Sequence, residues 1–403
     1  MSFLQDKIFK LKGKVQHYAW GGFSYIPAWL GEENKENKPY AEYWMGAHTS
    51  APSEIATPNG PLSLDVLIKD YPEDFIGEKV MKQFGELPYL FKILDVHEML
   101  SIQVHPTKEE AEKGFAAEEA TGVPLNAPNR NYKDKNHKPE VMVALSEFWL
   151  LHGFKPKADL MLTLKTIAEF AELEELFLEK SYKGLYQHVM ELPQEEVDEI
   201  LRPLVEKELK RKADGDLSKD QPGWWVCKLF EGKEDAIKSI DRGVFSIYFF
   251  NIMKANEGEA VFQGAGIPHA YLEGQNVELM ANSDNVLRGG LTPKHVDVPE
   301  LLKHTVFQGV DPQLLSGTDA NGEKVYHCPV PDFGISKIDL TGGQSYSGKA
   351  SSLETIVIID GELTITGTNV VTAGKGEALA ILQGESYTIS TGSHTLAYKA
   401  FVP

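Results

Sequence analysis

The sequence has few cysteines and no long apolar run. Its only two cysteines, Cys227 and Cys328, exclude a disulfide framework and a Cys-x-x-Cys metal cage. No stretch is apolar over the roughly 18 residues that a membrane helix needs. The N-terminal residues also lack an apolar segment followed by a small-residue cleavage site. We therefore expect a cytoplasmic protein without a membrane span.

Basic residues are outnumbered as well. The chain has 40 Lys and Arg against 59 Asp and Glu, which gives a formal net charge of -19 at pH 7. No run of Lys or Arg interrupts this balance. An acidic surface repels a phosphate backbone and an anionic lipid layer, so we expect no nucleic acid and no membrane as partner. A phosphorylated ligand would need a local group of cations.

The remaining composition is that of an ordinary globular protein. Apolar residues make up 42% and charged residues 25% of the 403 residues, enough for a large core and two or three structural units. Short apolar runs at 89–94 and 100–104, broken by Gly, Pro and acidic residues, predict strands. We expect residues 1–154 to form the first part of a β domain.

A helical pattern follows. Leucine and other apolar residues recur at helical spacing from about 158 to 213, and a second helix is predicted to start near Pro193. We therefore predict a helical insertion at 155–222. Strand patterns return at 244–253, so residues 223–310 are expected to complete the first β domain.

The C-terminal part, 311–403, is predicted to be a second β domain. Residues 353–371 contain two β-branched runs, and we predict a hairpin joined through Asp360 and Gly361. Residues 258–269 and 376–387 match in their glycines and small or apolar residues, but the first copy ends at His269 and the second at Tyr387. Both copies resemble the second cupin motif, in which a strand and turn deliver a histidine into a barrel. The resemblance implies a mainly β fold of cupin, or jelly-roll, β-barrels with an inserted α-helical domain. The C-terminal barrel would then hold no metal.

Potential metal ligands occur at three places. Gln103 and His105 are two residues apart in a predicted strand, so their side chains share a face. Glu140 opens an apolar strand, and His269 follows a Gly- and Pro-containing turn. Each alone has an ordinary explanation, because a single histidine near a strand is more often packed or exposed than a ligand. Glu140 alone could be a surface acid at a strand entrance.

Longer segments give these residues a common context. Residues 40–48, 87–113, 136–156 and 250–302, in this order, resemble the type I mannose-6-phosphate isomerases. The resemblance implies one Zn²⁺ per chain, held by Gln103, His105, Glu140 and His269. Two imidazoles, a carboxylate and an amide oxygen suit zinc, although iron or manganese would accept the same donors.

The resemblance also implies the reaction, which interconverts mannose 6-phosphate and fructose 6-phosphate through a cis-enediol. Such a reaction requires a base, an electrophile for the oxygens and a group that holds the phosphate. Candidate catalytic residues are Arg288, Glu278, Lys294, His137 and Lys138. Candidate phosphate contacts are Ser101, Lys92 and Lys138. The base stays open among Glu278, His137 and Lys138.

Structural roles compete with these assignments. Arg288 could form a salt bridge with Asp284, and the phosphate candidates could be a strand hydroxyl and solvated ammonium groups. We expect Trp20 and Trp44 to serve packing, since aromatic residues in β cores mostly do. The expected partner is a small sugar phosphate, and the chain is expected to be a monomer or a weak homo-oligomer.

Three other functions fit parts of the pattern. Two histidines and a carboxylate also form the iron site of some oxygenases, but Gln103, Arg288 and Lys294 disfavour this. A non-catalytic sugar-binding cupin would have lost ligands that this sequence keeps. A bifunctional relative that also transfers nucleotides would need a glycine-rich phosphate loop, which the sequence lacks.

Overall fold

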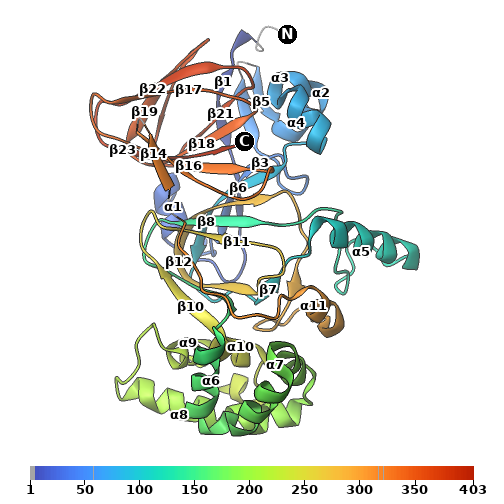
Figure 1. Ribbon diagram of the computed structural model, residues 1–403. Coiled ribbons are helices and arrows are strands. Elements are labelled where there is room, and N and C mark those ends of the chain that lie inside the picture. Colours follow the sequence, from blue (N-terminus) through green and yellow to red (C-terminus); the bar gives the residue numbers. More distant parts are fainter. Residues whose placement is uncertain (1–4, 58, 316, 321) are drawn as a thin grey trace.

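The computed structural model describes residues 5–57, 59–315, 317–320 and 322–403, and it contains three β-sheets and a block of helices. The ten-stranded sheet lies in the middle, between the C-terminal strands at one end and the helical block at the other (Figure 1). Among the described residues, no helix has the length and apolar character needed to cross a membrane.

The ten-stranded sheet has a main strand order of β10-β9-β12-β6-β3-β2, with four further strands paired beside this path. Its strands are β2 (Lys14–Gln16), β3 (Glu42–Gly46), β6 (Tyr89–Val96), β7 (Gln103–Val104), β8 (Glu140–Ala144), β9 (Phe148–Phe154), β10 (Phe250–Ala255), β11 (Ala260–Gln263), β12 (His269–Ala281) and β13 (Leu287–Arg288). The strand predicted at 89–94 and the apolar strand predicted to begin at Glu140 are thus confirmed.

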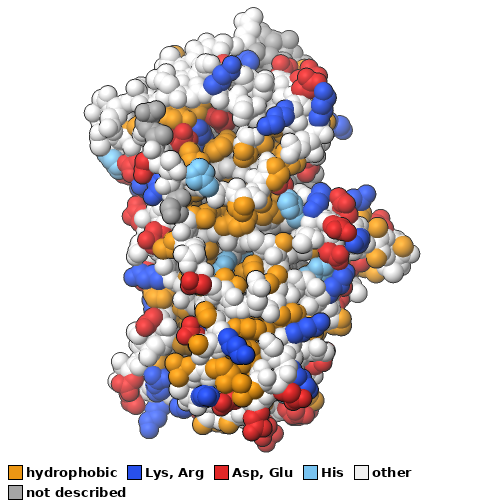
Figure 2. Space-filling view, viewed as in Figure 1, with side chains coloured by type: hydrophobic (Ala, Val, Ile, Leu, Met, Phe, Trp, Pro, Cys, Tyr) orange, Lys and Arg blue, Asp and Glu red, His pale blue; other side chains and the backbone are white. Residues whose placement is uncertain are grey.

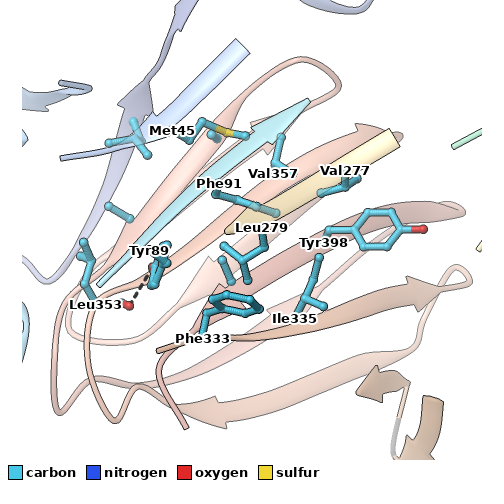
Figure 3. Packing of buried hydrophobic residues seen from close by; sticks show 14 of the residues in the cluster. Met45, Tyr89, Phe91, Val277, Leu279, Phe333, Ile335, Leu353, Val357 and Tyr398 are labelled. Atoms are coloured by element: carbon cyan, nitrogen blue, oxygen red, sulfur yellow. Dashed lines mark hydrogen bonds between the residues drawn. The ribbon is translucent and has the colours of Figure 1, made fainter. Parts of the chain in front are cut away.

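Alternation along β6 and β12 gives this sheet two different faces. Phe91, Val277 and Leu279 pack with Val357 and Tyr398 of the C-terminal strands in one apolar core (Figure 3). Successive side chains of a strand point to opposite faces. The residues between these apolar ones, including Lys92 and Glu278, therefore face away from this core, and they carry the candidate site.

The nine-stranded sheet combines the two ends of the chain, in the order β14-β15-β16-β23-β18-β21-β1-β4-β5. Its strands are β1 (Ile8–Lys12), β4 (Glu54–Thr57), β5 (Gly60–Ser63), β14 (Gly317–Ala320), β15 (Glu323–Tyr326), β16 (Gly334–Leu340), β18 (Glu354–Asp360), β21 (Ala378–Ile381) and β23 (Thr395–Phe401). The early strands β1, β4 and β5 thus join the C-terminal sheet, which differs from the expected assignment of 1–154 to the first β domain. Residues 1–4 of that range lie outside the described residues.

The predicted hairpin at 353–371 is wrong. Strand β18 pairs with β21 and β23, whereas the following strand β19 pairs with β20 and β22 in another sheet. Gly361, with φ of 80°, turns the chain from one sheet to the other. An added Cβ there would lie 2.3 Å from the His394 carbonyl oxygen, so the corner requires glycine. The four-stranded sheet contains β17 (Ser345–Lys349), β19 (Glu362–Thr366), β20 (Val370–Gly374) and β22 (Ser386–Ser390).

The helical block is longer than predicted. A helix starts at Gln194 directly after Pro193, as expected, but helices continue to Phe249 instead of ending near 222. The block contains α6 (Lys157–Thr166), η2 (Ala168–Phe170), α7 (Ala171–Glu191), α8 (Gln194–Ala213), α9 (Pro222–Phe230), η3 (Glu234–Lys238) and α10 (Gly243–Phe249). The strand predicted from residue 244 is wrong up to 249, because α10 is buried on every side and its apolar run has no helical periodicity to detect.

The remaining helices cover the sheets. They are α1 (Tyr25–Leu30), α2 (Leu64–Asp70), α3 (Pro72–Phe75), α4 (Gly77–Phe84), α5 (Lys108–Thr121) and α11 (Val298–His304). Helices α2, α3 and α4 lie beside the C-terminal strands, and α5 projects from the middle of the molecule (Figure 1).

The sequence repeat has a matching backbone. Gly258 and Gly376 have φ of 79° and 85°, and the strands that follow them, β11 and β21, have equal length. Gln263, the last residue of β11, pairs with Glu140, and Ile381, the last residue of β21, pairs with Glu354. Glu354 is therefore the counterpart of Glu140.

The same registers show what the second copy has lost. Gln103 lies opposite His269, while Gly348 lies opposite Tyr387. The Tyr387 hydroxyl donates to Glu354 at 2.5 Å, and Lys399 lies 2.8 Å from Glu323 and also donates to Tyr346. A buried ammonium surrounded by carboxylates and tyrosines thus fills this interior.

We predict that Lys399→Met destabilises the protein by roughly 3–5 kcal/mol, because it leaves the buried Glu354 and the partly buried Glu323 without a cation. Urea unfolding would measure the loss. Lys375→Met, which removes an exposed ion pair with Asp360, is the control and should change stability by less than about 1 kcal/mol. Equal stabilities of the two variants would contradict the prediction.

Candidate metal centre and adjoining cavity

Three buried side chains from different strands converge on one point. His105 follows β7, Glu140 is the first residue of β8, and His269 is the first residue of β12. One ligand atom from each lies within 4.8 Å of the other two. His105 Nε2 is 3.4 Å from Glu140 Oε1, and His269 Nε2 is 3.3 Å from Glu140 Oε2.

Backbone carbonyl groups determine the tautomers of both histidines. Nδ1 of His105 lies 2.8 Å from the Asn285 carbonyl oxygen, and Nδ1 of His269 lies 2.9 Å from that of Ile267. A carbonyl oxygen only accepts, so each Nδ1 carries the proton. Burial also lowers the pKa of His105 to about 4, which keeps its ring neutral.

Both Nε2 atoms consequently present lone pairs toward Glu140. They are buried and have no hydrogen-bond partner. Burial alone would raise the pKa of Glu140, but its neighbours, Lys138 first among them, outweigh this effect and lower it, so the carboxylate is ionised. Two lone pairs and a carboxylate that face each other repel unless a cation lies between them. The donor set therefore fits a divalent metal ion, and the carbonyl contacts are the orienting partners that metal-bound histidines usually have.

The fourth expected ligand lies beside this group. Gln103 is in register with His269 on one side and with Arg288 on the other. It also lines the cavity next to the three buried ligands. The two-residue strand β7 thus brings Gln103, His105 and Arg288 together.

The adjoining cavity has a volume of about 760 Å³. It brings together most of the predicted site residues, which come from β6, β7, β13 and the loops beside them. Those that line it are Lys92, Ser101, Gln103, Lys138, Arg288 and Lys294.

Arg288 and Lys294 are the unpaired cations of this cavity. Within the described part of the chain, neither forms an ion pair, so the alternative salt bridge between Arg288 and Asp284 does not form. Burial lowers the pKa of Arg288, and burial together with Arg288 lowers that of Lys294. An anion is the ligand that would compensate both charges.

Lys92, by contrast, is already paired. Its ammonium lies 3.0 Å from Glu278 and 3.3 Å from Glu42. Burial favours the neutral amine, but Glu278, Glu42 and Glu140 outweigh it and raise the pKa of Lys92. Burial also raises the pKa of Glu278. Lys92 lines the cavity, and its ammonium donates a hydrogen bond to Glu278.

The structure does not bring His137 to the cavity. Its Nε2 lies 2.9 Å from Asp332 Oδ1, and both residues line a different pocket of about 440 Å³. Lys138, one residue later, does line the cavity and lies 3.3 Å from Glu140. Alternation along an extended segment explains why these neighbours point apart.

Several lining residues escaped the sequence analysis. Trp44 and Trp20, expected to serve packing alone, line the cavity, and the Trp44 indole donates to Glu42. Asp284 also lines it and lies 3.3 Å from His48 Nε2. The two-residue spacing of Glu42 and Trp44, which places both side chains on one face of a strand, could have indicated that they lie together. Asp284 and His48 are far apart in the sequence, which offered no signal that they would meet.

Fold and geometry together define a protein of three β-sheets and a helical block, with a candidate divalent-metal centre beside a cavity that has unpaired cations. Comparisons with known proteins agree. The family described as "Phosphomannose isomerase type I, catalytic domain" matches residues 8–157. The chain is 36% identical to the mannose-6-phosphate isomerase of Escherichia coli (strain K12) over 396 residues, which cover 96% of this chain and 98% of that protein.

More distant relatives and solved structures point the same way. The human mannose-6-phosphate isomerase is 36% identical over 367 residues, 83% of each chain. A crystal structure of zinc-bound mannose 6-phosphate isomerase superposes with a TM-score of 0.88 at 34% identity and covers 98% of this chain and all of the other. A variant of the Salmonella typhimurium phosphomannose isomerase gives a TM-score of 0.89 with the same coverage. The chain therefore belongs to the mannose-6-phosphate isomerase family.

Proposed function

We propose that this protein interconverts mannose 6-phosphate and fructose 6-phosphate with one zinc ion per chain. The observation that carries the proposal is the pair of unprotonated histidine nitrogens that face Glu140 beside a cavity with two unpaired cations. The family membership supplies the substrate and the metal.

The fold belongs to the same proposal. We propose that the ten-stranded sheet and the C-terminal sheets are two cupin-type jelly rolls with the helical block inserted between β9 and β10. The repeated turn and register of β11 and β21 support this. The catalytic domain would consist mainly of 1–154 and 250–310, instead of the expected 223–310, and the metal-free domain of 311–403, with β1, β4 and β5 exchanged into the latter.

His105, Glu140, His269 and Gln103 would hold the zinc ion. When bound, zinc supplies positive charge that stabilises developing negative charge on substrate oxygens. The protein's own contribution is to fix both imidazoles through the Asn285 and Ile267 carbonyls.

Arg288 and Lys294 suit the phosphate and the sugar oxygens. Their charges are unpaired, whereas Lys92 and Lys138 already contact carboxylates. Ser101 lines the same cavity and offers a hydroxyl group. This favours Arg288, Lys294 and Ser101 as the anion contacts over the initially expected Lys92 and Lys138.

Lys92 and Glu278 suit the proton transfer between C1 and C2. Burial raises the pKa of Glu278 and so makes its carboxylate a stronger base, while Lys92, whose pKa the surrounding carboxylates raise, stays an ammonium 3.0 Å away. Glu278 would remove the proton next to the carbonyl group to form the cis-enediol and return it to the neighbouring carbon. Lys92, which faces the cavity, would donate to the substrate oxygen on which negative charge develops.

The net charge of -19 also bears on the choice of partners. We propose a small sugar phosphate as the partner, no nucleic acid, a cytoplasmic location and a monomer or weak homo-oligomer. Acidic and basic side chains are interspersed over the face shown in Figure 2 and form no continuous basic band there.

Chelation tests the function directly. We expect mannose 6-phosphate turnover, followed in a coupled assay, to disappear when a chelator removes the metal and to return when zinc is added. Magnesium addition is the control and should restore nothing, because imidazole donors hold it poorly. Full turnover in protein shown by elemental analysis to be metal-free would refute the proposal.

A further inference from the structure

A second cation-rich pocket lies within the helical block, and we name it the insertion pocket. It is formed by Lys155, which precedes α6, by Lys207 and Arg211 of α8, by Pro222 at the start of α9 and by Tyr248 of α10. Its volume is about 360 Å³. It shares no lining residue with the catalytic cavity.

Cations outnumber carboxylates among the residues that line the insertion pocket. Lys155, Lys207 and Arg211 face a single lining carboxylate, Glu208, which Arg211 contacts at 2.8 Å. Lys207 lies 3.7 Å from Glu169, outside the pocket lining. The surplus of cations contrasts with a chain whose net charge is -19.

Lys155 is the least compensated of these cations. Its ammonium donates to the Thr163 hydroxyl at 3.2 Å, and it forms no ion pair with any described carboxylate. Burial lowers its pKa to about 8. The Asp159 carboxylate offsets only part of this effect and forms no ion pair with the ammonium, so a largely buried cation without a contacting counter-ion gains stability when an anion enters the pocket.

Donors also outnumber acceptors. Tyr248 is 2% exposed, and its buried hydroxyl has no hydrogen-bond partner. The hydroxyls of Thr163 and Thr166 already donate to carbonyl groups of their own helix. Neither hydroxyl carries the negative charge that would compensate Lys155. An acceptor-rich ligand would satisfy Lys155 and Tyr248 together.

We propose that the insertion pocket binds a small phosphorylated molecule, separately from the catalytic cavity. A phosphate monoester carries about -1.5 to -2 charges and three acceptor oxygens, which suits three cations with one carboxylate and an unbonded tyrosine hydroxyl. Ile167 and Pro222 provide an apolar wall for the rest of the ligand.

Binding of inorganic phosphate tests this proposal. The zinc-loaded Arg288→Ala/Lys294→Ala protein, whose catalytic cavity lacks its unpaired cations, is titrated while the ³¹P linewidth is followed. We expect saturable binding that Lys155→Met weakens by about tenfold or more and Lys207→Met weakens to a smaller degree. Lys165→Met, which replaces an exposed lysine of α6 that pairs with Glu174, is the matched control and should leave the affinity unchanged.

Two results would overturn the proposal. One is the absence of saturable binding in the Arg288→Ala/Lys294→Ala protein. The other is equal affinity in the Lys155→Met, Lys207→Met and Lys165→Met proteins. Circular dichroism checks that each variant is folded, and because Lys207 is half-exposed, Lys207→Met keeps the test decisive if Lys155→Met fails to fold.

Discussion

His269→Ala should abolish metal binding and lower isomerase turnover by about a thousandfold or more. Removing this imidazole leaves Glu140 and His105 without the third buried donor that completes the cluster. The loss of the ion removes several kcal/mol of charge stabilisation, which corresponds to roughly three powers of ten in rate. Elemental analysis and a coupled assay with mannose 6-phosphate would measure the two effects in the same preparation.

His394→Ala is the matched control for this experiment. His394 also pairs with a carboxylate, that of Asp339, but it lies exposed directly before β23. Its removal should leave metal content and turnover near those of the unchanged protein. A His269→Ala protein that retained stoichiometric zinc and normal turnover would show that the buried triad is not the metal centre.

The sequence was most informative where a feature depends on neighbouring residues. The helix after Pro193 has acidic residues in its first turn and basic ones in its last, a pattern set by the helix dipole. The strand of Glu140 is likewise visible in its apolar run. The two-residue spacing of Gln103 and His105 indicated a shared face before any partner was known.

Features that depend on distant pairing could not be predicted in this way. Nothing near residue 8 shows that β1 will pair with β21 at the other end of the chain. The run at 353–371 has every local feature of a hairpin, yet packing separates β18 and β19 into two sheets. Lys92 appeared as a free cation because its partners, Glu42 and Glu278, come from the neighbouring strands β3 and β12.

The family resemblance supplied what local spacing could not, but it did not distinguish the roles of the cations. Lys92, Lys138, Arg288 and Lys294 were equivalent positive charges in the sequence. In the structure the first two contact carboxylates and the last two do not. Pairing thus separates cations that act beside a carboxylate from cations suited to hold an anion.

Arg288→Ala tests this separation. We expect metal content to be retained and kcat/KM to fall by about 10²–10³, because the guanidinium stabilises negative oxygen near the metal centre without being part of it. Arg288→Lys should recover only part of the loss, since an ammonium supplies the charge but not the two parallel donors. Arg202→Ala, which removes a guanidinium paired with Asp198 in the helical block, should leave kcat/KM unchanged. If the Arg288→Ala protein instead lost its zinc or turned over normally, Arg288, which pairs with Gln103 across the strands, would have only a structural role.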